Sequence, residues 1–163
     1  LNVPRDTPRR DHRRCAMKRH GSILLAVAVA AGVAGCAAGT RAGAFDRIAA
    51  AAAQKDGVRE ISYAQFIEIS NSGEEYVLLD VLDEESYREG HIDGASNLPV
   101  GKITKESAER MLKKDARVVV YCGSFLCTAS TSAAKKLSAL GYTVLDYKGG
   151  LKEWKEKGNA LAR

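Results

Sequence analysis

An apolar run of β-branched and aromatic residues, 118–121, leads directly into Cys122. A short loop, 123–128, then separates Cys122 from a helical pattern that begins at Ala129. A continuous apolar run is typical of a strand buried in a parallel sheet, and α/β proteins bind ligands in the loops that follow such strands. Backbone N–H groups and a helix N-terminus favour a thiolate at that point, and the thiolate is the nucleophilic form. The stretch therefore predicts an α/β fold and a nucleophilic Cys122.

The rest of the chain between about residues 58 and 158 alternates short apolar runs with helical patterns. We expect strands over 76–81, 117–121 and 143–147, and helices over 63–69, 83–88, 105–114, 129–140 and 151–157. We also expect Met111, Leu112 and Trp154 to face the core. About 100 residues are enough for one domain. The prediction is a single α/β domain over 58–160, with a mostly parallel central sheet and helices on both faces.

The residues before this domain have the features of an export signal. Residues 17–21 are basic, residues 22–34 form an apolar core of signal-peptide length, and residues 33–36 resemble a bacterial lipobox ending at Cys36. We expect removal of residues 17–35 and a lipid on Cys36, which anchors the protein to a membrane. The alternative is an ordinary signal peptide in which Cys36 is incidental. Residues 1–16 precede this signal and are interpreted as an over-extended start or a disordered segment.

This interpretation gives a location and a spacer. The domain is expected in the cell envelope, on the periplasmic face of a membrane, or outside the cell in a Gram-positive organism. Ala37 follows the lipobox in place of the Asp that retains lipoproteins at the inner membrane, which favours the outer membrane. Residues 36–57 are rich in Ala and Gly and are interpreted as a linker between the lipid and the domain, with helix propensity over 45–55.

The net charge of +5 comes from the leader. Residues 1–35 hold seven of the 25 Lys and Arg residues and two of the 20 Asp and Glu residues, which leaves 18 of each from Cys36 onward. The mature chain is therefore close to neutral, and its charge is no argument for nucleic-acid binding. We expect no nucleic-acid partner.

Two cysteines, Cys122 and Cys127, lie in the predicted domain. Export favours an oxidising compartment, where this pair can form a disulfide. The spacing of the two cysteines is not that of a zinc site, and His91 is the only histidine after His20. We therefore expect neither a metal nor another cofactor.

In order and spacing, several segments of the domain resemble a known family. Residues 58–158 are similar to a single rhodanese domain, and the matching segments are 79–81, 87–95, 97–99, 119–122, 133–137, 141–142 and 149–154. The resemblance implies a sulfurtransferase in which Cys122 takes sulfane sulfur from a donor and passes it, through a persulfide, to a thiol or other nucleophile. The donor would be a small sulfur-containing anion, such as thiosulfate or a polysulfide, or a protein persulfide.

The resemblance also assigns roles to other residues. The loop that follows the nucleophile would bind the substrate through Gly123, Ser124, Phe125, Leu126 and Thr128. Asp80 is expected to accept hydrogen bonds from loop N–H groups, and His91 to be bonded within the crossover loop. Catalytic roles for Asp80 and His91 are the less favoured alternatives.

The sequence departs from the family pattern in three places. Leu82 stands where the family has Arg, so an internal ion pair is absent. The loop carries no Arg to hold an oxyanion, which predicts weak thiosulfate binding. The loop is also longer than usual, as in related phosphatases, but those need an Arg at the position of Thr128. Phosphate-ester hydrolysis is therefore disfavoured.

Cys127 leaves the function open between several alternatives. It could attack a Cys122 persulfide as a resolving thiol, which would make the domain a thiol-disulfide relay. It could equally pack under the loop or form a static disulfide with Cys122. A non-enzymatic module that carries sulfur or binds a protein partner, whose identity the sequence does not indicate, is a further alternative to the enzyme.

Overall fold

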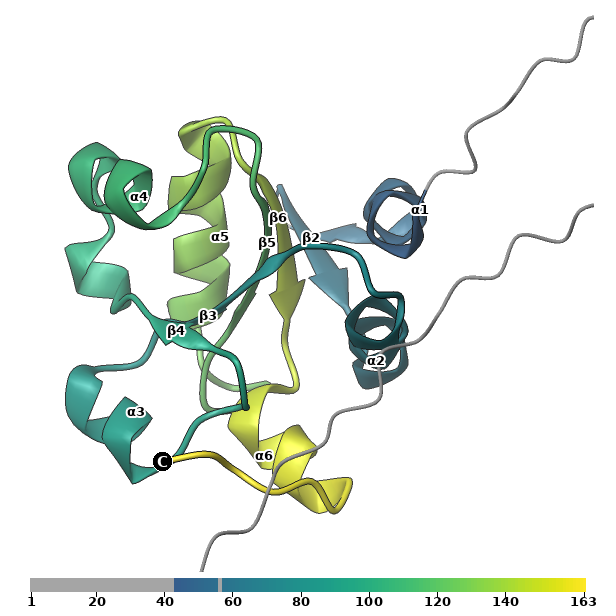
Figure 1. Ribbon diagram of the computed structural model, residues 1–163, viewed down its shortest axis with the longest axis vertical. Coiled ribbons are helices and arrows are strands. Elements are labelled where there is room, and N and C mark those ends of the chain that lie inside the picture. Colours follow the sequence, from purple (N-terminus) through teal and green to yellow (C-terminus); the bar gives the residue numbers. More distant parts are fainter. Residues whose placement is uncertain (1–42, 56) are drawn as a thin grey trace, which may run out of the picture. The chain divides into compact units, whose positions relative to one another are not determined.

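The structure of the protein, a computed structural model, describes residues 43–55 and 57–163 (Figure 1). The expected signal peptide, the lipidation site Cys36 and the segment 1–16 lie outside the described residues. A six-stranded sheet with the order β1-β2-β6-β5-β3-β4 forms the centre of the described part. The strands are β1 (Gln54–Lys55), β2 (Val58–Ile61), β3 (Val77–Asp80), β4 (Ser96–Asn97), β5 (Arg117–Tyr121) and β6 (Thr143–Tyr147).

All neighbouring strands pair in parallel except β1, which pairs antiparallel with β2. The central pair is in register from Arg117 opposite Thr143 to Tyr121 opposite Tyr147. The carboxyl ends of β3, β5 and β6 consequently meet at one edge of the sheet. The predicted fold class, a single α/β domain with a mostly parallel sheet, is confirmed.

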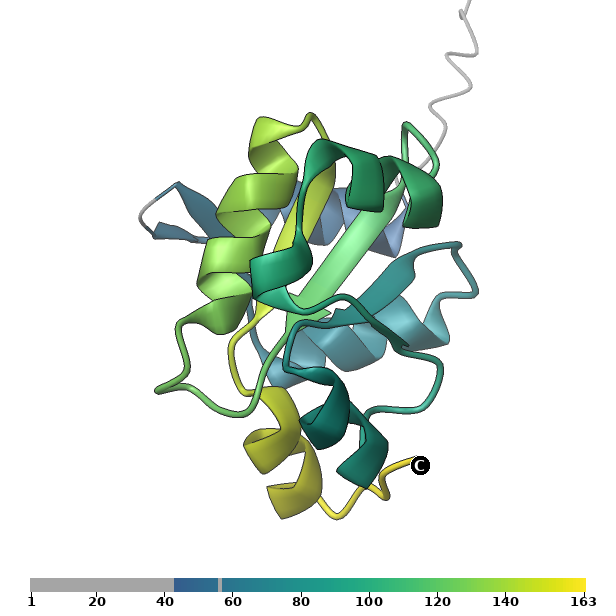
Figure 2. The ribbon, with the colours of Figure 1, turned by 90° about the vertical axis from the view of Figure 1, so that its left-hand side faces the viewer.

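Helices cover both faces of the sheet (Figures 1 and 2). They are α1 (Ala44–Ala51), α2 (Tyr63–Asn71), α3 (Glu84–Glu89), α4 (Lys105–Met111), α5 (Ala129–Ala139) and α6 (Gly150–Glu156), with a 3-10 turn η1 over Val100–Lys102. In Figure 1, α4 and α5 lie on one face of the sheet, and α1 and α2 lie on the other. Among the described residues, no helix has both the length and the apolar character needed to cross a bilayer.

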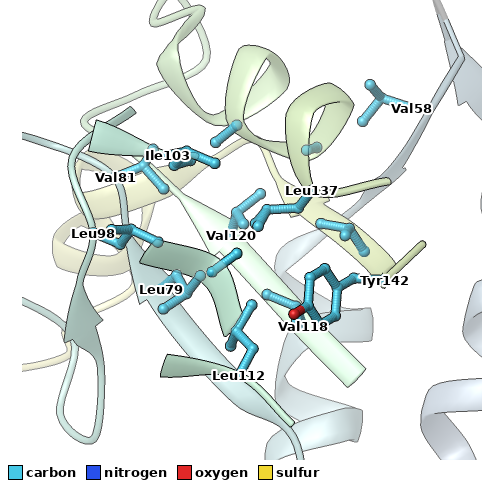
Figure 3. Close-up of a cluster of buried hydrophobic side chains, with 14 of the residues drawn as sticks. Val58, Leu79, Val81, Leu98, Ile103, Leu112, Val118, Val120, Leu137 and Tyr142 are labelled. Carbon is cyan, nitrogen blue, oxygen red and sulfur yellow. The ribbon is translucent and has the colours of Figure 1, made fainter. Parts of the chain in front are cut away.

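The alternation of side chains along β5 divides the core into two clusters, because successive residues of a strand point to opposite faces. Val118 and Val120 pack with α4 and α5 on one face (Figure 3). Val119 and Tyr121 pack with α1 and α2 on the other. All four of these side chains are fully buried, as the continuous apolar run predicts for a central parallel strand.

Side-chain caps explain where several helices begin. Ser62 and Gln65 form a reciprocal capping box at the start of α2, and Thr104 and Ser107 do the same for α4. At α3, the carboxylate of Asp83 accepts hydrogen bonds from the N–H groups of Glu85 and Ser86. These contacts satisfy backbone donors that have no partner inside the helix.

The folded domain begins earlier than the sequence predicts. The segment expected to be a linker up to residue 57 contains α1, which buries Phe45 and Ile48 in the second core cluster, and β1, which extends the sheet. Asp46 of α1 also forms a 2.6 Å ion pair with Arg117 of β5. The helix propensity over 45–55 was visible in the sequence, but its burial was not, because burial depends on packing against distant elements.

Two further differences concern side-chain direction and length. Met111, expected in the core, is 41% exposed, whereas Leu112 is buried as predicted. Helix α4 ends at Met111 rather than at residue 114, so the expected helical face does not extend that far.

The C-terminal segment is tied to the crossover loop, because the backbone of Ala162 pairs with that of His91.

We predict that Phe45→Ala lowers the free energy of unfolding by about 3–5 kcal/mol, because it leaves a cavity in a fully buried site. The matched control is Phe125→Ala, at a side chain that is 59% exposed, which should change stability by less than about 0.5 kcal/mol. Chemical denaturation of both variants tests this. Equal, small effects would show that α1 is a spacer and not part of the domain.

Candidate functional site

Cys122 lies at the carboxyl edge of the sheet, directly after the central strand β5. Residues 123–128 form a loop that leads into α5, which begins at Ala129 as the sequence predicts. The neighbouring strand β6 ends one residue before Lys148, at the same edge. The parallel register therefore brings the groups that follow β5 and β6 together around the loop.

The backbone of Cys122 is fixed by the beginning of α6. Its carbonyl accepts a 3.0 Å hydrogen bond from the N–H of Leu151, and the Gly123 carbonyl accepts one of 2.9 Å from Lys152. Gly150 has a φ of +57° and lies so close that a Cβ there would collide with the Cys122 carbonyl. A glycine is needed for both the backbone conformation and the close approach.

The Cys122 thiol is fully buried in the loop. Its Sγ lies 3.3 Å from Oγ of Ser130 and 3.6 Å from the carbonyl oxygen of Cys127. Burial raises the pKa of Cys122, and the neighbouring Cys127 thiol adds to this, although the hydroxyl and N–H of Ser130 work in the opposite direction. The N–H of Ser130, in the first turn of α5, thus favours the Cys122 thiolate as the sequence predicts, but desolvation is larger and the pKa of Cys122 is raised on balance.

Cys127 has the opposite properties. It is half-buried, and both cysteines are free thiols. Partial burial works to raise the pKa of Cys127, but other groups outweigh it: the hydrogen bond from Cys122, the N–H groups of Ala129 and Gly123, and the Lys148 charge. The pKa of Cys127 is thus lowered, and this thiol receives the stabilisation that the sequence assigns to Cys122.

A polar network from β6 supports the loop. Lys148 Nζ donates to the Cys127 carbonyl at 2.9 Å and to Thr131 Oγ1 at 3.0 Å. Thr131 in turn donates to Oδ2 of the fully buried Asp146 at 2.9 Å. Burial raises the pKa of Asp146, while the hydroxyls of Ser130 and Thr131 and the Lys148 charge oppose this. Oδ1 of Asp146 is buried and makes no hydrogen bond among the described residues.

The sequence analysis did not identify Lys148, Asp146 or Thr131 as site residues. One signal in the sequence did point to Lys148. It directly follows a predicted strand, and residues that follow two neighbouring parallel strands lie at the same edge of the sheet. Lys148 supplies a fixed cation next to a loop that carries no Arg.

The remaining loop residues are distributed between the interior and the surface. Gly123 and Ser124 are half-buried, and the Ser124 carbonyl accepts a 3.0 Å hydrogen bond from the N–H of Cys127. Thr128 is exposed and does not cap α5 with its side chain. Phe125 and Leu126 are 59% and 93% exposed, so the tip of the loop presents two apolar side chains to solvent.

Asp80 and His91 have structural surroundings. Oδ1 of the buried Asp80 accepts a 2.9 Å hydrogen bond from the N–H of Leu82, as expected for a loop acceptor. Burial raises the pKa of Asp80, while the Leu82 N–H lowers it. Nδ1 of His91 lies 3.0 Å from the Tyr87 carbonyl oxygen, and its ring stacks on the Tyr87 ring at 3.9 Å. These contacts fit the structural roles assigned from the sequence.

Within the described part of the chain, no group of three or more His, Cys, Asp or Glu side chains is arranged to hold a metal ion. The chemical groups at the loop are instead two thiols, a lysine and backbone N–H donors. Such a site can carry a covalent sulfur intermediate and stabilise its negative charge.

Residues 62–157 match the sequence profile of the rhodanese-like domain. This is more than half of the chain, and the protein therefore belongs to the rhodanese-like domain family.

Individual relatives agree with this assignment. The thiosulfate sulfurtransferase PspE of Escherichia coli is 35% identical over 75 residues, which cover 46% of this chain and 70% of PspE. The HTH-type transcriptional regulator Rv0324 of Mycobacterium tuberculosis is 33% identical over 113 residues, 68% of this chain. The match spans 49% of Rv0324, so the chain corresponds to about half of that regulator.

A solved structure supports the fold. The BH2092 protein of Bacillus halodurans superimposes with a TM-score of 0.58 at 32% identity, over 63% of this chain and 75% of that protein. Similarity to proteins called thiosulfate sulfurtransferases supports a sulfurtransferase family. The regulator among the relatives shows that the domain also occurs in proteins with other names, so the fold alone does not define the reaction.

We predict that Gly150→Ala destabilises the domain by about 3 kcal/mol, because the new Cβ adds a collision with the Cys122 carbonyl to the strain of a left-handed backbone. The control is Gly158→Ala, which has a similar φ of +83° but no neighbouring atom within 4 Å and should cost only about 1 kcal/mol. Denaturant titration compares the two variants. If both variants lose the same free energy of unfolding, the close approach of residue 150 to the Cys122 carbonyl does not contribute to stability.

Proposed function

We propose that this protein is a sulfurtransferase that takes sulfane sulfur from a donor onto Cys122 and transfers it to a thiol or other nucleophile. The observation that carries the proposal is the position of Cys122, at the carboxyl end of the central strand and at the start of a loop held against α6. In the proposed reaction, the Cys122 thiolate attacks the sulfane sulfur, the donor leaves with the electron pair, and a Cys122 persulfide remains. A second nucleophile then attacks the outer sulfur.

The burial of Cys122 defines what must happen before that attack. Because its thiol is fully buried and donates to Ser130, the proton must leave and the loop must open toward the donor. Ser130 is the first hydroxyl in the path of that proton, and Lys148 is the nearby cation that can balance the charge of an anionic donor. Lys148 thus takes over, from β6, part of the role that the absent loop Arg has in the family.

The surface of the loop favours a particular kind of donor or acceptor. Phe125 and Leu126 expose apolar side chains at the loop tip, which a small inorganic anion does not need. These side chains favour transfer to or from a protein, and they are the observation behind a second candidate function, a sulfur carrier that presents its persulfide to a protein partner. Polysulfide is proposed as a better small donor than thiosulfate.

Substitution of the nucleophile tests the proposed reaction. Cys122→Ser should reduce sulfur transfer from polysulfide to dithiothreitol by about a thousandfold or more, because it removes the atom that carries the covalent intermediate. Its free energy of unfolding should change by less than about 1.5 kcal/mol, since Ser is close in size to Cys and Ser130 remains as a hydrogen-bond partner. Substantial transfer by a folded Cys122→Ser variant would exclude the mechanism.

We further propose that the protein acts in the cell envelope, anchored by a lipid on Cys36. The sequence around this residue is the basis of the proposal. In a bacterial host, the full chain should partition into the detergent phase, and Cys36→Ala should abolish this partition because the acyl chains have no attachment point. Cys15→Ala is the matched control and should partition like the parent. Equal partition of the parent and Cys36→Ala into the aqueous phase would favour an ordinary signal peptide.

A further inference from the structure

A transfer reaction that uses Cys122 alone does not explain the second cysteine of the loop. Cys127 follows Cys122 by five residues, its backbone carbonyl oxygen lies 3.6 Å from the Cys122 Sγ, and both thiols are free. The loop folds back on itself through the hydrogen bond from the Cys127 N–H to the Ser124 carbonyl. Any sulfur atom added to Cys122 therefore forms next to a second thiol.

The surroundings of Cys127 are built to activate this thiol. Lys148 Nζ donates to the Cys127 carbonyl oxygen at 2.9 Å, and its charge, with the N–H groups of Gly123 and Ala129, lowers the pKa of the Cys127 thiol. Lys148 is itself held by Thr131, which is bonded to the buried Asp146. The Lys148 ammonium group is thus fixed against the loop by a network that begins in β6. Its charge lowers the pKa of Cys127.

We propose that Cys127 is a resolving thiol that converts the Cys122 persulfide into a Cys122–Cys127 disulfide and releases hydrosulfide. This inference rests on the proposed persulfide on Cys122. The Cys127 proton passes to the outer sulfur of the persulfide, the Cys127 thiolate attacks Sγ of Cys122, and the bond between the two persulfide sulfurs breaks. The outer sulfur leaves with the electron pair as HS⁻. The two cysteine sulfurs lose two electrons in total, and the sulfane sulfur gains them.

The choice of the inner sulfur follows from the leaving groups. Attack on the outer sulfur would expel the Cys122 thiolate into a fully buried position, where a charged sulfur is disfavoured. Attack on the inner sulfur expels hydrosulfide, which can leave toward solvent past the half-buried Cys127. In thiol exchange the more stable anion leaves faster, so disulfide formation with sulfide release is favoured over migration of the persulfide.

A disulfide product gives the domain a second reaction partner. An external dithiol must reduce the Cys122–Cys127 bond before another sulfur can be accepted. The complete cycle reduces sulfane sulfur to hydrosulfide at the expense of that dithiol. The second partner is therefore a dithiol reductant, small or protein-borne, in addition to the sulfur acceptor of the proposed function.

A single-turnover experiment on the domain, residues 43–163, tests the proposal. Reduced protein is treated with polysulfide, excess donor is removed, and hydrosulfide and intact mass are followed with no added thiol. The parent should release one hydrosulfide and lose two hydrogens, with a peptide linking Cys122 to Cys127. Cys127→Ser should keep its persulfide at least about tenfold longer, because it lacks the intramolecular attacking group.

Two outcomes separate this proposal from the proposed function. If neither protein gains a sulfur, the persulfide mechanism fails and the resolving role fails with it. If both gain a sulfur on Cys122 and hold it for the same time, without a disulfide, sulfur transfer stands and the resolving role is overturned. A persulfide mapped to Cys127 in the parent would also overturn it, in favour of migration.

Lys148 is a positioning residue in this scheme, and its variant provides a readout that loss of structure would not give. The groups that face Cys127 are the Cys122 thiol from the end of β5, Lys148 from the end of β6, and the N–H groups of the loop. Lys148→Gln should move the pH profile of hydrosulfide release to higher pH, and Lys148→Arg should restore it. The control Lys155→Gln removes an exposed lysine of α6 and should leave the profile in place. An unchanged profile in Lys148→Gln would remove Lys148 from the scheme.

Discussion

The alignment of the carboxyl ends of β5 and β6 is the constraint on which the rest of the site depends. Because the two strands are parallel and in register up to Tyr121 and Tyr147, the residues that follow them must meet at one edge. The hydrogen bond from Leu151 N–H to the Cys122 carbonyl then locks the end of β5 to the start of α6. Everything that acts on the thiols, including Lys148 and the loop N–H groups, is positioned by this pair of strand ends.

The balance between burial and hydrogen bonding shifts the pKa values of the two thiols in opposite directions. Cys122 is fully buried, and desolvation outweighs the contacts that would stabilise its thiolate. Cys127 lies closer to the surface, and more groups stabilise its thiolate. A buried thiol is protected from unspecific oxidation, and in the proposed reaction it becomes accessible only when the loop opens. The more acidic thiol lies beside it, which is the arrangement expected if the two act in succession.

Much of this arrangement could be predicted from the sequence, for reasons that are local. The run 118–121 and the residues after it predicted strand β5, the position of Cys122 at its end and helix α5, because burial pattern and turn residues are adjacent along the chain. The bounds of β5 and β6 are those predicted. Asp80 and His91 also have the supporting contacts that the family resemblance implied.

The remainder depends on contacts between distant segments, which a single sequence does not display. Lys148 and Asp146 join the site only because β6 lies beside β5, and Phe45 is buried only because α1 packs across the sheet. The acidity of Cys122 was misjudged because the effect of the helix N-terminus can be inferred from sequence, but the depth of burial cannot.

The central claim is that Cys122 carries sulfur, and an intact-mass spectrum tests it most directly. The reduced domain, in the Cys127→Ser form so that the product persists, is treated with polysulfide or thiosulfate and freed of excess donor. The account predicts a gain of one sulfur that peptide mapping places on Cys122. A protein that remains folded and gains no sulfur from either donor would contradict it.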